Sequence, residues 1–139
     1  HSFGGWTTYA SVTADARYRA AVMLAPAVPA GPPHVTIPSL TMLSWLDTYV
    51  PLPAIRTAFA TADAPKYLVE LRDAGHFAYS QNCFPSPDCN PPATMTQDEA
   101  HEAVLRWVVP FLERHLAGTP GREPFFLEPV PGTVLTTVP

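Results

Sequence analysis

The chain opens with HSFGG (residues 1–5), and this stretch decides how the rest of the sequence is interpreted. With one glycine ahead of His1 it would contain G-x-S-x-G, the motif of a sharp strand-to-helix turn that exposes a nucleophilic serine. Glycines suit such a turn because the strained backbone and the close helix–strand packing leave no space for side chains. Ser2 is therefore a candidate nucleophile, and we expect a glycine and an apolar strand before His1.

Three apolar runs of strand length follow, and segments of helical character alternate with them. The strands are expected at residues 18–27, 39–46 and 66–71, and the helices at 4–12, at 51–62 and from a capping box at 96–99 to about Gly118. This alternation predicts the α/β class, with a parallel sheet covered by helices on both faces.

Three strands would leave both edges of that sheet open. We therefore expect the chain to be the C-terminal portion of an α/β domain. Residues 1–118 would belong to that domain, and residues 119–139 would form a proline-rich tail lying extended over the surface.

Composition excludes several classes of protein. The 139 residues are 47% hydrophobic, which is enough for a sizeable core. A net charge of −4, with Lys66 as the one lysine, offers no basic face for nucleic acid. Prolines interrupt the most hydrophobic region, so no run approaches the roughly 20 apolar residues of a transmembrane helix.

Two cysteines bracket a short loop rich in turn formers. Cys83 and Cys89 are separated by F-P-S-P-D, and we expect a disulfide between them, with two free thiols as the alternative. A zinc site is disfavoured because no second Cys/His pair has suitable spacing. A disulfide would imply an oxidising compartment, so we expect a secreted or otherwise extracytoplasmic protein.

A serine nucleophile needs an imidazole to accept its proton and a carboxylate to orient that imidazole. Asp47 directly follows the 39–46 strand and His76 follows the 66–71 strand, so both fall at carboxyl ends of predicted parallel strands. Asp73 is the competing acid, although its place three residues before His76 suits a turn residue better. The histidines at 34, 101 and 115 are interpreted as solvated or structural.

Three motifs, H-S-F-G-G, L-D-T-Y-V-P and Y-L-V-E-L-R-D-A-G-H-F, resemble the α/β-hydrolases over about residues 1–118. The likeness is greatest to secreted serine esterases grouped with platelet-activating-factor acetylhydrolase and predicted dienelactone hydrolases. A true dienelactone hydrolase would have a cysteine nucleophile, so Ser2 argues against that chemistry.

This resemblance implies a carboxylic-ester hydrolase that forms an acyl-enzyme on a small-molecule or lipid ester and needs no cofactor. It also implies that the Phe3 amide is one oxyanion-hole donor, and that the second donor comes from the N-terminal portion of the same hydrolase domain.

Two other functions compete with the esterase interpretation. The chain would be a non-catalytic half if it only completed the fold of a partner polypeptide. An amidase with an N-terminal nucleophile, exposing Ser2 after loss of His1, is disfavoured because the chain is not rich in strands.

Overall fold

The computed structural model describes residues 1–31, 34–81, 94–121 and 130–138. Helices and strands alternate along these residues, which confirms the predicted α/β class. In chain order the elements are α1 (Phe3–Ala14), β1 (Ala21–Leu24), β2 (Ser39–Ser44), α2 (Leu52–Thr61), β3 (Lys66–Leu71), the 3-10 helix η1 (His76–Tyr79), α3 (Gln97–His115) and β4 (Thr133–Val138).

The four strands form one mixed sheet in the order β1-β2-β3-β4. The first three run parallel, as expected from their continuous apolar sequences, and all residues of β2 and β3 are buried. Within the described residues β1 pairs only with β2, so its other edge carries no strand.

Strand β4 corrects the prediction for the C-terminal tail. Instead of lying over the surface, Thr133–Val138 pairs antiparallel with β3 and closes that edge of the sheet. The segment T-V-L-T-T-V is rich in β-branched residues, which favour strands. It follows a turn at Gly132, whose positive φ of 73° suits glycine. The prolines nearby obscured this signal in the sequence.

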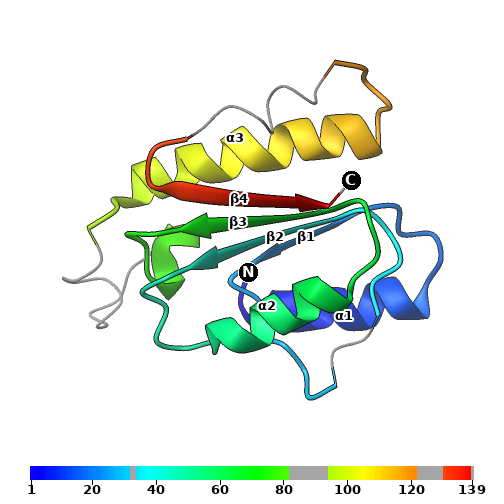
Figure 1. Cartoon of the computed structure of the whole chain (residues 1–139), viewed down its shortest axis with the longest axis horizontal. Coiled ribbons are helices and arrows are strands. Elements are labelled where there is room, and N and C mark those ends of the chain that lie inside the picture. Colours follow the sequence, from blue (N-terminus) through cyan, green and yellow to red (C-terminus); the bar gives the residue numbers. More distant parts are fainter. Residues whose placement is uncertain (32–33, 82–93, 122–129, 139) are drawn as a thin grey trace.

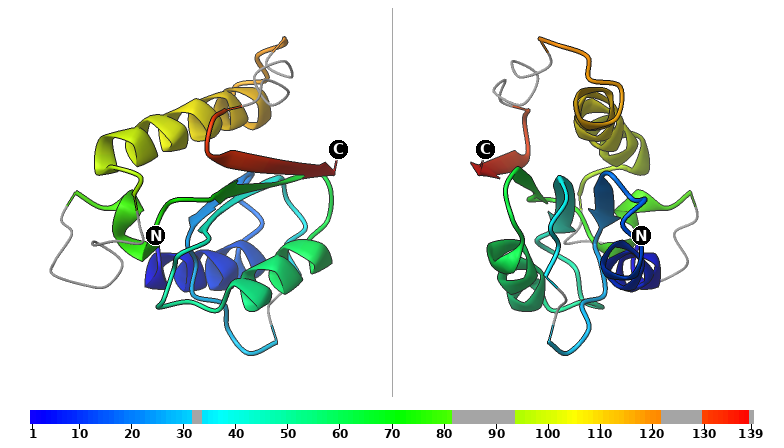
Figure 2. Two further views of the ribbon diagram at one scale, coloured as in Figure 1. Left: turned by 60° about the vertical axis from the view of Figure 1, so that its left-hand side comes forward. Right: turned by 90° about the vertical axis from the view of Figure 1, so that its right-hand side faces the viewer.

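The helices cover the sheet from both sides. In Figures 1 and 2, α1 and α2 lie on one face and α3 lies on the other. Helix α3 begins with the predicted capping box, in which Thr96 and Glu99 bond each other's backbone N–H groups, and it continues through Pro110.

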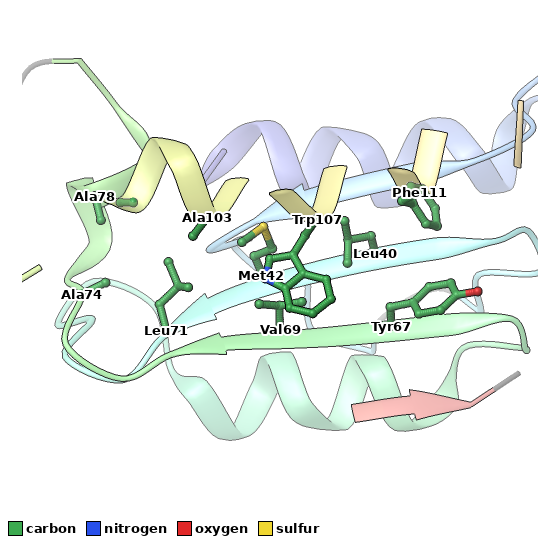
Figure 3. Close-up of a cluster of buried hydrophobic side chains, with 11 residues drawn as sticks. Leu40, Met42, Tyr67, Val69, Leu71, Ala74, Ala78, Ala103, Trp107 and Phe111 are labelled. Carbon is green, nitrogen blue, oxygen red and sulfur yellow. The ribbon is translucent and has the colours of Figure 1, made fainter. Parts of the chain in front are cut away.

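The main hydrophobic core lies between α3 and the sheet. Figure 3 shows Trp107 and Phe111 of α3 directed toward side chains of β2 and β3, among them Leu40 and Val69. Two smaller clusters join the opposite face to α2 and α1. Packing on both faces holds the parallel strands in place. The loops that follow their carboxyl ends therefore start from a rigid sheet.

The loops after β2 and β3 are bonded directly to each other. Trp45 donates its N–H to the carbonyl of Leu71 over 2.9 Å, and Leu46 donates to Ala74 over 3.1 Å. These bonds extend the parallel ladder beyond the strands, so the residues after Ser44 and after Leu71 stay side by side. None of the helices among the described residues is long and apolar enough to cross a bilayer.

Candidate active site

Ser2 occupies a strained turn at the start of α1. Its φ of 54° and ψ of −120° lie outside the regions that side-chain-bearing residues ordinarily adopt. The turn is held against the end of β1, because Ser2 donates its N–H to Leu24 and accepts at its carbonyl from Ala27, each over 2.9 Å. The geometry expected from H-S-F-G-G is therefore present at this residue.

The two glycines after Phe3 have different surroundings. A Cβ added to Gly5 would lie 2.3 Å from the Cβ of Pro26, so this position requires glycine. A Cβ added to Gly4 would meet no described atom within 4 Å. The expectation that both positions lack space for a side chain is therefore wrong for Gly4.

Ser2, His76 and Asp47 form one hydrogen-bonded chain. The Oγ of Ser2 lies 2.8 Å from Nε2 of His76, and Nδ1 of His76 lies 2.8 Å from Oδ2 of Asp47. A carboxylate only accepts, so the proton of neutral His76 sits on Nδ1 and leaves Nε2 free to accept from the Ser2 hydroxyl. This arrangement can take a proton from the serine.

Both oxygens of the Asp47 carboxylate are engaged in hydrogen bonds. Its Oδ1 accepts from the backbone N–H groups of Tyr49 and Val50, over 2.8 and 2.9 Å, while Oδ2 faces His76. The side chain of Asp47 is 0% exposed and that of His76 is 3% exposed. Water is thus kept away from the ion pair that would form if His76 were protonated, which strengthens their attraction.

Aromatic rings surround the imidazole of His76. Tyr49 stacks on it, with ring centroids 5.1 Å apart, and Phe77 meets it edge-on at 5.2 Å. His1 approaches to 4.8 Å. None of these three residues was singled out from the sequence for contact with His76. The sequence feature that could have pointed to each is its distance along the chain from a candidate triad residue. Tyr49 is two residues after Asp47, Phe77 follows His76, and His1 precedes Ser2.

A partly buried tyrosine lies behind the site. The hydroxyl of Tyr79 accepts a hydrogen bond of 3.0 Å from Ser44, the last residue of β2, and its ring packs against that of His1. Burial raises the pKa of Tyr79 well above its ordinary range. The hydrogen bond from Ser44 opposes this shift and the charge of Asp47 adds to it. Tyr79 therefore stays neutral and acts as packing beneath the histidine.

Phe3 provides the backbone N–H expected to face the reacting oxygen. It is the first residue of α1, so its N–H has no acceptor within the helix, and the described residues give it no other backbone acceptor. Helix N-termini also favour negative charge. This amide is free to donate to an anionic oxygen beside Ser2.

Asp73, the competing acid, lies in a different environment. It lines a cavity of about 700 Å³ together with residues of α3, such as Glu102 and Arg106, and with Gly132 ahead of β4. No residue of the Ser2–His76–Asp47 chain is among the described residues of that lining. Asp73 lies in the turn directly after β3, as its position before His76 suggested, and its backbone carbonyl accepts from Thr94 and Met95.

The remaining candidates of the sequence have simpler positions. His34 is exposed and paired with Asp63, and His115 lies 3.3 Å from the hydroxyl of Tyr67. Cys83 and Cys89 fall outside the described residues, so their pairing stays a prediction. Across the described ranges no cluster of three His, Cys, Asp or Glu side chains has the arrangement of a metal site.

Comparisons with known proteins identify a fold. No family model matches the chain, and no curated protein matches it. Among solved structures it is similar to a ferulic acid esterase from Streptomyces cinnamoneus, with a TM-score of 0.78 and 22% sequence identity. The match covers 99% of this chain and 45% of the esterase, so the chain spans less than half the length of that structure. The fold is shared, and the activity named for the esterase belongs to that protein.

Proposed function

We propose that this chain carries the catalytic triad of a serine hydrolase that cleaves carboxylic esters, with Ser2 as nucleophile, His76 as base and Asp47 as the orienting acid. The observation that carries the proposal is the pair of 2.8 Å contacts through which His76 joins Ser2 to Asp47. These residues come from three separate segments and meet at the carboxyl ends of parallel strands, where open α/β sheets place their sites.

The reaction follows the geometry of the three side chains. Ser2 Oγ attacks the ester carbonyl carbon while its proton passes to Nε2 of His76, and the charge that forms on the imidazole is stabilised by Asp47. His76 then returns the proton to the departing alcohol, which leaves an acyl group on Ser2. A water molecule, deprotonated by the same nitrogen, attacks the acyl-enzyme, and the proton returns to Ser2.

The negative oxygen of each tetrahedral intermediate needs hydrogen-bond donors. The N–H of Phe3 supplies one, because it adjoins Ser2 at the N-terminus of α1 and has no helical acceptor. The second donor, in this proposal, comes from the N-terminal portion of the same domain. The free edge of β1 and the 45% coverage of the esterase structure both support further strands on that side.

A carboxylic ester suits the surroundings of Ser2 best. The likeness in fold to a ferulic acid esterase supports this class of substrate, and the half-exposed ring of Tyr49 provides apolar surface against the imidazole of His76. We place the enzyme outside the cytoplasm on the expected Cys83–Cys89 disulfide, and this location rests on that pairing alone.

The competing proposal is a non-catalytic half that only completes a partner's fold. The strained backbone of Ser2 is the observation against it, because such strain persists where function requires it and a purely structural segment has no need of it.

A fluorophosphonate, which reacts with activated serines, separates the two proposals when it is applied to the complete protein. Intact mass and peptide mapping should show one adduct, on Ser2. Ser2→Ala should abolish both labelling and ester hydrolysis, and Ser11→Ala, which alters a serine within α1 itself, should retain them. Labelling elsewhere, or hydrolysis that survives Ser2→Ala, would favour the non-catalytic half.

A further inference from the structure

The residue before the nucleophile bonds the backbone of the residue proposed as the base. Nε2 of His1 lies 2.9 Å from the carbonyl oxygen of His76, although 75 positions separate the two residues. A carbonyl can only accept, so the proton of the His1 imidazole must sit on Nε2. His1 therefore joins the turn that carries Ser2 to the turn that carries His76.

The backbone of His76 lies just after Ala74, which is bonded to Leu46 in the loop after β2, and before Ser80, which is bonded to Gln97 of α3. His76 begins the short 3-10 helix η1, whose flanking bonds are local: Ala78 to Gly75 over 3.3 Å and Ser80 to Phe77 over 3.0 Å. Bonds of this type hold the shape of a turn without fixing where the turn sits relative to other segments. The bond from His1 comes from the turn ahead of α1, so it links His76 directly to the segment that carries Ser2.

The imidazole of His1 is itself held in place by neighbouring rings. Its centroid lies 4.8 Å from that of His76 and 5.7 Å from that of Tyr79, and Tyr79 is anchored to Ser44 of β2. Because the rings of His76 and Tyr79 pack against the His1 imidazole, its Nε2–H stays directed at the carbonyl oxygen of His76.

We infer that His1 is a positioning residue, which sets the separation between Ser2 Oγ and His76 Nε2 by holding the backbone of His76 through its Nε2–H. The inference rests on the proposed function, since it assigns a role toward the same nucleophile and base. Proton transfer depends steeply on the distance between donor and acceptor, so a small displacement of His76 lowers kcat while substrate binding is kept.

Three substitutions separate the hydrogen bond from the packing. His1→Leu removes both the donor and the aromatic ring. His1→Phe keeps a ring and removes the donor. His1→Gln places an amide N–H near the position of Nε2 and removes the ring. His34→Leu, at an exposed histidine paired with Asp63, is the matched control for loss of an imidazole.

The measurement is kcat and KM for ester hydrolysis by the complete protein, with circular dichroism to check folding. We expect His1→Leu and His1→Phe to lower kcat about tenfold, the effect of one lost hydrogen bond, with KM changed less than about twofold. His1→Gln should recover most of kcat, and His34→Leu should match the wild type. Wild-type kcat in His1→Phe, or no recovery in His1→Gln, would overturn the inference.

A second readout is independent of turnover. The proton shared by His76 Nδ1 and Asp47 should give a low-field proton NMR signal, which disappears when the histidine moves and the proton exchanges with water. It should persist in His1→Gln and be lost in His1→Phe, and the reverse would contradict the role of the donor. If wild-type Ser2 resists the fluorophosphonate while this pattern holds, the proposed function fails and the positioning role of His1 stands.

Discussion

Substitution of the two adjacent glycines in α1 by alanine should have opposite effects on stability. Gly5 packs against Pro26, where an added Cβ would lie 2.3 Å from the Cβ and 2.7 Å from the Cα of the proline. Gly4 is exposed, and an added Cβ there would meet nothing described within 4 Å. Gly4→Ala is therefore a matched control for Gly5→Ala, with the same chemical change one residue away.

The magnitude follows from the distances. Carbon atoms in contact stay roughly 3.5 Å apart, so Gly5→Ala must separate α1 from Pro26 by roughly 1 Å. Overpacking of this kind costs up to about 3 kcal/mol, and the better helix propensity of alanine returns about 1 kcal/mol, which leaves a net loss of about 2 kcal/mol. Gly4→Ala keeps only the gain, about 0.5–1 kcal/mol in a helix.

The displacement should also reach the nucleophile. Gly5 donates its N–H to the carbonyl of Ser2 over 2.8 Å, and Ala27, next to Pro26, donates to the same carbonyl. A helix pushed away from Pro26 therefore pulls on both bonds to the Ser2 carbonyl. Gly5→Ala should slow fluorophosphonate labelling of Ser2, whereas Gly4→Ala should leave it within about twofold of the wild type, since nothing near it moves.

Chemical denaturation followed by circular dichroism measures the first effect, and the rate of labelling measures the second. The two variants should differ in free energy of unfolding by about 3 kcal/mol, the sum of the loss at Gly5 and the gain at Gly4. Equal stability of the two variants would refute the packing argument. A destabilised Gly5→Ala that still labels at the wild-type rate would refute the link between this contact and Ser2.

Three further predictions concern the acid, the partly buried ion pair of Arg56 and Glu70, and the cysteines. Asp47→Asn should lower kcat by roughly 10⁴ because the amide favours the wrong imidazole tautomer, whereas Asp73→Asn should stay within about tenfold, and the reverse order would show that the acid is misassigned. Burial alone would raise the pKa of Glu70, but hydrogen bonds from Arg56 and an indole hold it below its usual 4.5. The ionised carboxylate therefore stabilises the fold above about pH 4.5 and this contribution is lost as pH falls through the lowered pKa, so the free energy of unfolding of Glu70→Gln should approach that of the wild type in acid. Thiol titration of the unreduced, denatured protein should find no free cysteine, and two reactive thiols would contradict both the disulfide and the extracytoplasmic location.

Most of the fold was predictable because the parallel strands are buried on both faces. That burial produces runs that are mostly apolar, such as K-Y-L-V-E-L, and β3 has the predicted bounds of Lys66–Leu71. Strand β1 is shorter than expected, at Ala21–Leu24, because the chain turns sharply at Ala25, with a φ of 40°, before Pro26. Apolar composition alone does not reveal where such a turn begins.

Strand β4 was missed for a different physical reason. It is an edge strand of Thr133–Val138 whose residues are half-buried or exposed, so its sequence carries no strong apolar signal. Its partner β3 lies more than 60 positions earlier, and pairing at that separation depends on the completed sheet. The prolines before it are compatible with a loop followed by a strand, as well as with the expected tail.

The contacts within the candidate triad also differ in how far the sequence predicts them. One contact follows from strand topology, and the other depends on side-chain packing. Asp47 and His76 follow neighbouring parallel strands, and backbone bonds from Trp45 and Leu46 carry the ladder into both loops, so topology alone brings their side chains together. Ser2 is the N-cap of α1, and its backbone is bonded to Leu24 and Ala27 at the end of β1. Strand β1 does not adjoin β3, so no ladder joins the turn of Ser2 directly to the loop that carries His76. The contact between Ser2 and His76 depends on side chains, with His1 among them, and such packing leaves no periodic signal in one sequence. We therefore infer that loss of the His1 donor changes the distance between Ser2 and His76 most, and that it reaches the proton shared by His76 and Asp47 through the same displacement of His76.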